Sequence, residues 1–187
     1  LSVIDCCEHG EASYNTIFVG IASYRDSECS RTIRDLFEQA ESPDRVFVGA
    51  VLQLDRDVDI ECLAVDSDNL DGTTNENFKK WCQKHVRTLE MSWQQATGPC
   101  WARHICRSLW QGEKYFLQID SHMRFRGNWD SYLVQCLEEA RSEETPKPVL
   151  STYPLGYTLP NNVPRDTRAT LLIPQKFDGD GMLRQSG

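Results

Sequence analysis

The chain has 187 residues, of which 40% are hydrophobic and 26% charged, and its formal net charge is −8. These values are ordinary for one folded domain, or most of one. The negative charge argues against nucleic acid as a partner, and no stretch is apolar enough to span a bilayer, so we expect no membrane contact within this chain. A nucleotide remains compatible, because a few local cations or one metal ion can hold a diphosphate on an acidic protein.

Buried strands and helices are predicted to alternate in the first half of the chain. Residues 16–22 and 46–53 are short apolar runs, which are typical of strands buried on both faces. Between them, apolar residues at helical spacing predict a helix over residues 29–40. Residues 54–84 are polar and predict an exposed excursion with one short helix, followed by a weaker strand at residues 86–91.

The second half continues the same alternation. A Gly-Pro pair opens a predicted helix over residues 98–110, with the proline at a tolerated first-turn position. Residues 115–120 form the next apolar strand, and clean helical spacing predicts a helix over residues 129–140. Residues 149–153 and 170–173 are the last two predicted strands.

This order of elements predicts an α/β fold, in which a mostly parallel, Rossmann-like sheet carries helices on both faces. Residues 1–15 are polar and are predicted to be irregular. In open α/β sheets, ligands bind outside the carboxyl ends of the strands. That rule selects three candidate patches: residues 23–26, Gln53 and residues 120–122.

The strongest candidate site is Asp120-Ser121-His122, at the end of a predicted buried strand. If the backbone is extended there, the carboxylate and the imidazole point the same way. One carboxylate oxygen and one imidazole nitrogen suit Mn²⁺ or another divalent cation better than thiolates would. A diphosphate, waters or a further protein ligand would complete the site. The alternative is an aspartate that caps a turn beside a surface histidine.

Two further segments are candidates for nucleotide contacts. Arg25 can hold a phosphate or a uracil carbonyl group, and Tyr24 can stack on a base. The alternative is a surface turn in which Arg25 pairs with Asp26. Arg103 lies near the start of a helix, where a cation beside free backbone N–H groups forms a phosphate site. The alternative for Arg103 is a solvated or salt-bridged helix residue.

The eight cysteines show no CxxC spacing, which argues against a zinc ribbon. We interpret them as free, buried thiols of a reducing compartment, which predicts a cytoplasmic protein. The even number leaves a disulfide-bonded protein open. A location in the Golgi lumen would follow if a membrane anchor precedes Leu1.

Together, residues 17–26, 98–103 and 115–125 resemble the eukaryotic polypeptide α-N-acetylglucosaminyltransferases. That family includes the enzyme that modifies hydroxyproline on the ubiquitin-ligase subunit Skp1. The Asp-Ser-His triplet is also similar to the metal motif of the mucin-type N-acetylgalactosaminyltransferases. The resemblance extends from about Ile17 to the end of the chain.

The resemblance implies a GT-A type fold and makes residues 16–187 the N-terminal, nucleotide-sugar-binding part of a glycosyltransferase catalytic domain. It implies transfer of N-acetylglucosamine from UDP-N-acetylglucosamine (UDP-GlcNAc), with retention of configuration, to a serine, threonine or hydroxyproline hydroxyl of a protein acceptor. Asp120 and His122 would bind the metal ion. The nucleotide-sugar pocket would be lined by Ser23, Tyr24, Arg25, Arg103 and Asp120. No residue is identified as a catalytic nucleophile.

One departure from the family pattern concerns the end of the chain. Family members continue with an acidic Gly-Glu-Glu segment and a further histidine, neither of which occurs here, so we expect a chain truncated at its C-terminus. The rival interpretation is therefore a non-catalytic nucleotide-sugar-binding or interaction module. A second rival is an unrelated Rossmann-like protein, although no G-x-G-x-x-G follows the first strand, which argues against a dinucleotide enzyme.

Overall fold

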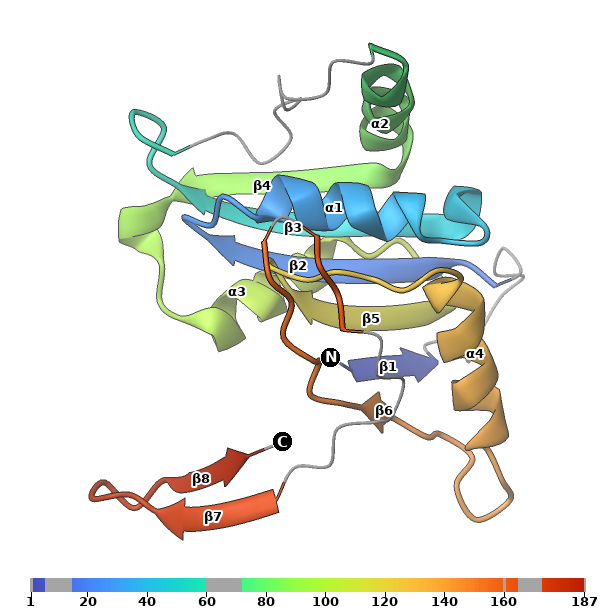
Figure 1. Cartoon of the computed structure of the whole chain (residues 1–187), viewed down its shortest axis with the longest axis vertical. Helices are drawn as coiled ribbons and strands as arrows, with labels where there is room; N and C mark the ends of the chain where they lie inside the picture. Colours follow the sequence, from blue (N-terminus) through green and yellow to red (C-terminus); the bar gives the residue numbers. More distant parts are fainter. Residues whose placement is uncertain (1, 6–14, 60–71, 160, 165–172, 187) are drawn as a thin grey trace.

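The computed structural model describes residues 2–5, 15–59, 72–159, 161–164 and 173–186, and its main element is a six-stranded sheet with the order β4-β3-β2-β5-β1-β6 (Figure 1). Its strands are β1 (Ser2–Asp5), β2 (Ile17–Tyr24), β3 (Val46–Leu54), β4 (Val86–Ser92), β5 (Tyr115–Asp120) and β6 (Leu150–Ser151). Strands β2 to β5 run parallel, whereas β1 is antiparallel to both of its neighbours. The mostly parallel sheet predicted from the sequence is confirmed.

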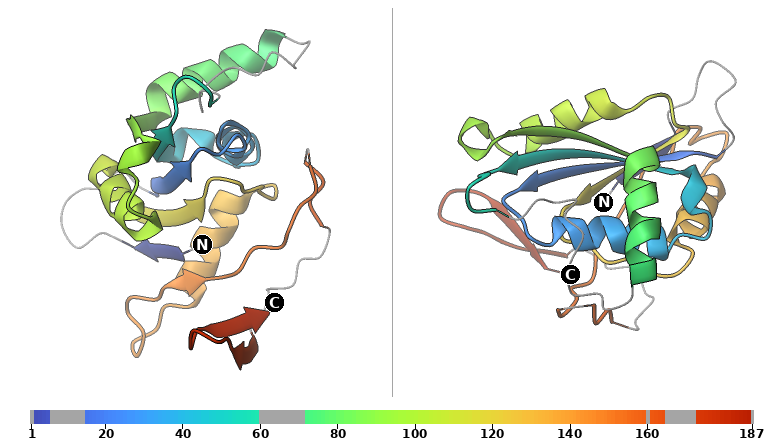
Figure 2. Two further views of the ribbon diagram at one scale, coloured as in Figure 1. Left: turned by 90° about the vertical axis from the view of Figure 1, so that its left-hand side faces the viewer. Right: turned by 90° about the horizontal axis from the view of Figure 1, so that it is seen from above.

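Helices cover both faces of this sheet. Within the described residues, the α-helices are α1 (Cys29–Glu38), α2 (Gly72–His85), α3 (Pro99–Cys106) and α4 (Trp129–Glu139). Seen from above, α1 and α2 lie on one side of the sheet and α3 on the other (Figure 2). The side chains of β2 alternate accordingly: Val19 and Ile21 join the core cluster of α1, α2 and α4, and Phe18 packs with Ala102 and Cys106 of α3.

Glycines in the sheet allow α3 to pack closely against it. A Cβ atom at Gly49 would lie 2.3 Å from the Phe18 ring and 3.0 Å from Leu109, so no larger residue fits there without a shift. The Cys106 thiol donates a hydrogen bond to the Gly49 carbonyl oxygen at 3.0 Å. This close packing fixes α3, and therefore its N-terminus, at the carboxyl edge of the sheet.

The differences from the predicted elements lie near the chain ends and in the polar excursion. The helix within the excursion, α2, is longer than the single short helix expected, and residues 60–71 lie outside the described part of the chain. Ser2–Asp5, inside the segment predicted to be irregular, form β1, because pairing with β5 and β6 on both sides stabilises this short strand. Residues 170–172 of the last predicted strand are not described; β7 (Ile173–Phe177) pairs with β8 (Leu183–Ser186) in a separate hairpin.

Among the described cysteines, Cys29 and Cys100 differ from the expectation of free, buried thiols, since Cys100 is free but exposed. Cys29, the first residue of α1, is disulfide-bonded, because pairing depends on proximity in the fold rather than on spacing in the sequence. Cys82, Cys100, Cys106 and Cys136 are free. Burial raises the pKa of the Cys82 and Cys106 thiols to about 11, which makes both unreactive at neutral pH. No helix in the described residues has the length and apolar character needed to cross a membrane.

Candidate functional site

The parallel strands β2 to β5 end at one edge of the sheet, where their arrowheads point to the same side in Figure 1. Two hollows open at this edge. One, the α3 pocket, has a volume of about 340 Å³ and is lined by Ala22, Tyr24, Gln53, Ala96, Gly98, Pro99 and Ala102. The other, the β4 pocket, has a volume of about 540 Å³ and is lined by Leu54, Asp55, Arg56, Asp57, Glu90, Met91, Ser92, Trp93 and Gln94. Both volumes lie in the range of small-molecule sites.

Arg25 turns the chain out of the sheet directly after β2. Its φ of 49° lies in the left-handed region, which a non-glycine residue adopts only where its surroundings enforce it. Here the Arg25 N–H donates to the Gln53 carbonyl oxygen at 3.0 Å. Its guanidinium group donates to both carboxylate oxygens of Asp59, with Nε–Oδ2 at 2.9 Å, and lies 5.1 Å from the centre of the Trp93 ring. Arg25 therefore pairs with Asp59, and not with Asp26.

The α3 pocket combines an aromatic side chain with a buried amide group. Tyr24 is about half exposed at its mouth. Gln53 is buried, and its Nε2 donates to the Ser23 carbonyl oxygen at 3.2 Å, whereas its Oε1 has no hydrogen-bond partner among the described residues. Gly98, which precedes α3, has a φ of 107° that favours glycine at this position. The pocket thus offers a stacking surface, and one of its lining residues, Gln53, carries an unpaired acceptor that protein atoms enclose in this structure.

The remaining residues predicted for the pocket have different positions. Ser23 is fully buried, lines neither pocket, and its hydroxyl group has no hydrogen-bond partner in the described part of the chain. Strand alternation explains this position, because Ser23 faces the side opposite to Tyr24. Arg103 and Asp120, which the sequence singles out separately, form an ion pair with Nη2–Oδ1 at 2.8 Å. Both side chains are exposed, by 42% and 54%, so this pair can open to a ligand at low cost.

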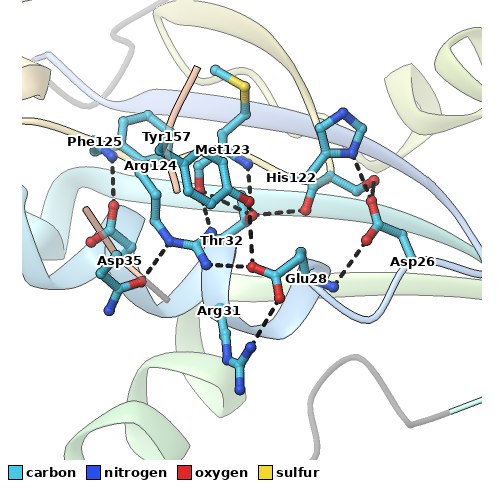
Figure 3. A network of polar contacts seen from close by, with 12 residues as sticks. Asp26, Glu28, Arg31, Thr32, Asp35, His122, Met123, Arg124, Phe125 and Tyr157 are labelled. Carbon is cyan, nitrogen blue, oxygen red and sulfur yellow. Dashed lines mark hydrogen bonds and ion pairs between the residues drawn. The ribbon is translucent and has the colours of Figure 1, made fainter. Parts of the chain in front are cut away.

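Asp26 joins the end of β2 to the residues that follow β5. Its Oδ2 accepts a hydrogen bond from the Ser121 hydroxyl at 2.6 Å and another from His122 Nδ1 at 2.8 Å (Figure 3). Its Oδ1 accepts from the Glu28 N–H at 2.9 Å. Burial tends to raise the pKa of Asp26, but these hydrogen bonds outweigh it and hold the pKa below the ordinary value for aspartate. Asp26 is therefore an ionised acceptor at neutral pH, and His122 Nδ1 must carry the donated proton.

Residues 121–126, which we call the β5 loop, are fixed to α1 by hydrogen bonds (Figure 3). Thr32 Oγ1 donates to the Ser121 carbonyl oxygen at 2.7 Å and accepts from the Met123 N–H at 2.9 Å. Thr32 is fully buried, so these bonds satisfy backbone groups that water does not reach. The bonds fix the backbone on both sides of His122.

Arg124, within the β5 loop, provides a second attachment of this loop to the residues around it. Its side chain is only 1% exposed and forms an ion pair with Glu28. It also donates from Nε to Asn161 Oδ1 at 2.7 Å and lies 4.4 Å from the centre of the Tyr157 ring. Burial tends to raise the pKa of Glu28, but its contacts with Arg124 and Arg31 outweigh burial and lower it. The β5 loop is thus held by a buried ion pair as well as by hydrogen bonds.

The family model described as Glycosyltransferase (GlcNAc) matches residues 16–78 and 60–187 of the chain. The chain belongs to this glycosyltransferase family. The match covers every residue of the two pockets and of the β5 loop. A comparison with curated proteins finds no match.

Asp120 and His122 are the residues of this glycosyltransferase that could offer ligands to a divalent cation. Asp120 and His122 both face solvent, and the bond from His122 Nδ1 to Asp26 leaves Nε2 for a ligand. A carboxylate on the second ring nitrogen is the usual arrangement at metal-binding histidines. Among the described residues, no group of three or more His, Cys, Asp or Glu side chains could hold a metal ion. An ion held by Asp120 and His122 would therefore need further ligands from a bound molecule or from water.

Sequence reasoning about this glycosyltransferase missed three features of the site. Their position after strands selects residues 23–26 and Gln53 as candidate patches, but it assigns no chemical role to Asp26 or Gln53. A signal for Asp26 is present in the sequence, because Asp26 follows the strand that pairs in parallel with the strand leading to the predicted metal motif. Asp59 lies within a polar acidic run, and nothing in its spacing identifies it as the partner of Arg25.

Proposed function

We propose that this glycosyltransferase transfers N-acetylglucosamine from UDP-GlcNAc to a serine, threonine or hydroxyproline hydroxyl of a protein acceptor, with the assistance of a divalent cation. The observation that supports it most directly is the pair of solvent-facing side chains, Asp120 and His122, at the carboxyl edge beside the α3 pocket, with His122 oriented by Asp26. The family match supports glycosyl transfer in general. The donor, the acceptor and the cation are the specific parts of the proposal.

The uridine moiety is proposed to occupy the α3 pocket. The exposed ring of Tyr24 offers a face for stacking on the uracil ring, and Gln53 of the same pocket carries a buried Oε1 that has no hydrogen-bond partner among the described residues. A buried acceptor without a partner is unfavourable in the free protein, so a ligand donor that reaches it is bound more strongly. Arg25, held by Asp59 at the same edge, adds a cation near the nucleotide.

The diphosphate is proposed to lie between α3 and the β5 loop. Arg103 can turn from Asp120 to a phosphate oxygen, because the pair between them is exposed. Asp120 and His122 Nε2 would then hold the divalent cation. That ion, when bound, stabilises the negative charge that develops on the leaving diphosphate. The resemblance to retaining enzymes suggests that the acceptor oxygen bonds to the anomeric carbon on the face that the diphosphate leaves, and that a diphosphate oxygen takes the hydroxyl proton.

The compartment is also a proposal. The disulfide bond at Cys29 supports an oxidising compartment, such as the Golgi lumen, more than the cytoplasm, because disulfides rarely persist in reducing compartments.

The decisive test measures ligand-induced stabilisation of the 187-residue chain. UDP-GlcNAc with Mn²⁺ should raise the melting temperature by several degrees, because a ligand that binds only the folded state stabilises it. Asp120→Ala should abolish the part of the shift that depends on Mn²⁺. Asp180→Ala is the matched control, since Asp180 is an exposed carboxylate in the β7–β8 turn, and it should retain the full shift. A full shift in Asp120→Ala, or no shift in the wild-type protein, contradicts the proposal.

Turnover separates the enzyme from the alternative, a nucleotide-sugar-binding module without activity. Peptides that contain hydroxyproline, serine or threonine should release UDP from UDP-GlcNAc in the presence of Mn²⁺. If the protein binds UDP-GlcNAc but releases no UDP with any of the three peptides, the result supports the binding module instead.

A further inference from the structure

The carboxylate of Asp26 accepts hydrogen bonds both from the turn that contains it, at Glu28, and from the residues after β5. One oxygen, Oδ1, accepts the N–H of Glu28, two residues further along the chain, at 2.9 Å. The other oxygen, Oδ2, accepts from two side chains, Ser121 at 2.6 Å and His122 at 2.8 Å. A turn aspartate needs only the first of these bonds. The second oxygen therefore has a separate role.

The bond to Oδ2 selects one form of the His122 ring. A neutral imidazole carries one N–H, and the nitrogen without the proton is the one that can bind a metal ion. Because a carboxylate only accepts hydrogen bonds, its contact with Nδ1 keeps the proton there and leaves the Nε2 lone pair free. The His122 side chain is 61% exposed, so solvent and ligands reach the ring.

Asp26 is itself held in place. Its side chain is 19% exposed, and the Ser121 donor belongs to a residue that is buried and whose carbonyl group is bonded to Thr32. The three donors around Asp26 thus come from two chain segments, the start of α1 and the β5 loop, which are fixed to each other (Figure 3). A carboxylate fixed in this way can hold a ring in one orientation.

We propose that Asp26 is a positioning residue of the donor site, which holds the Nδ1–H of His122 so that Nε2 is presented as a ligand to the divalent cation. This inference rests on the proposed function, and it assigns to Asp26 a role that acts through His122 and not by contact with the substrate. Outer partners of this kind typically change metal affinity about 10- to 100-fold when they are removed.

Asp26→Asn tests the proposal because it preserves the turn and reverses the contact with the ring. The amide oxygen can still accept the Glu28 N–H, which places the NH₂ group against Ser121 and His122. Ser121 can rotate its hydroxyl group to accept, whereas Nδ1 can accept only if the ring proton moves to Nε2. The substitution should therefore convert His122 to the tautomer whose Nε2 cannot bind a metal ion.

Two measurements on the full chain detect the change of the His122 tautomer and its effect on Mn²⁺ binding. Long-range ¹H–¹⁵N correlation spectra of the histidine rings, recorded without metal at a pH where imidazole is neutral, should show Nδ1–H for His122 in the wild-type protein and Nε2–H in Asp26→Asn. Titration of Mn²⁺ in the presence of UDP, followed by the electron paramagnetic resonance signal of the free ion, should show about 10- to 100-fold weaker binding in the variant. Ser121→Ala, which removes the other donor to the same oxygen, is the control and should retain the tautomer and bind Mn²⁺ within about threefold of the wild-type protein, because the ring contact persists.

Each outcome decides the proposal. An unchanged tautomer, or Mn²⁺ binding by Asp26→Asn as tight as that of the wild-type protein, overturns it and leaves Asp26 as a turn residue. If the variant does not fold, the spectrum of the wild-type protein decides, since Nε2–H there also overturns the proposal. Failure of the wild-type protein to bind Mn²⁺ would count against the proposed function, while the tautomer measurement would still show whether Asp26 orients His122.

Discussion

The ion pairs at the carboxyl edge of the sheet fall into two regions that differ in burial. Arg103 and Asp120 form a pair in which both side chains are exposed. In the β5 loop, by contrast, the Arg124 side chain is buried against Glu28 and beside the Tyr157 ring. An exposed pair exchanges readily with ligands, whereas breaking a buried pair leaves a charge without a partner. In this protein, the Arg103–Asp120 pair proposed to meet the ligand can open, whereas the β5 loop beside it is firmly held.

The largest effect is expected from Arg124→Ala, which breaks the buried pair. Glu28 would keep its charge without its main partner, and the contacts with Tyr157 and Asn161 would be lost. We expect the free energy of unfolding in urea to fall by about 3–5 kcal/mol. The control is Arg126→Ala, at an exposed position of the same loop. It should change the free energy of unfolding by less than about 0.5 kcal/mol. Equal effects of the two substitutions would contradict the distinction between the regions.

The difference in the free energy of unfolding between the wild-type protein and Arg124→Ala should depend on pH. The pKa of Glu28 is lower in the folded protein than its ordinary value, so the stability that it contributes is complete above the unfolded-state pKa and is lost as the pH falls through the lower, folded value. The difference between the wild-type protein and Arg124→Ala should therefore shrink below about pH 4. Urea titrations at a series of pH values measure it, and a difference that stays constant down to pH 3 would be inconsistent with an ionic contact.

The smallest effect on stability is expected from Arg103→Ala. Its exposed pair with Asp120 should contribute less than about 1 kcal/mol to the free energy of unfolding. The affinity for UDP should nevertheless fall about tenfold, because a hydrogen bond to a charged phosphate is lost. Isothermal titration calorimetry measures the affinity, with Arg107→Ala, an exposed arginine of the following turn, as the control. A loss of stability above 2 kcal/mol, or unchanged UDP affinity, would show that Arg103 belongs to the firmly held region instead.

The central strands could be predicted from the sequence because their pattern is local. β2 and β3 are buried on both faces, which requires the continuous apolar runs at residues 17–22 and 46–52, whereas β5 alternates buried and half-buried positions and includes Gln118. β1 could not be predicted in this way. Its four residues form a strand because Ser2 lies opposite Gln118 on one side and Ser151 on the other. Neither pairing can be inferred from the residues next to β1 in the sequence.

The site was predictable to the extent that it depends on position after a strand. Tyr24, Arg25 and Asp120 lie at the carboxyl edge, as the strand order requires. Ser23 shows the limit of that rule, because the alternation of side chains turns it away from both pockets.

Ion-pair partners could not be predicted, since they join residues that are distant in the chain. Arg25 lies next to Asp26 in the sequence and yet pairs with Asp59. Arg124 resembles an ordinary surface arginine in the sequence, but Glu28, Tyr157 and Asn161 contact it in the fold. Spacing identifies which residues can carry charge at the edge, and the fold decides which charges meet.

The position of β1 between β5 and β6 has a consequence for synthesis of the chain on the ribosome. The four residues of β1 emerge before both of their partners, Tyr115–Asp120 and Leu150–Ser151. The β2–β3–β4 part of the sheet can pair much earlier, since its connections are shorter. β1 is therefore among the last strands of this sheet to dock, because its long-range pairing must wait until β5 and β6 have been translated.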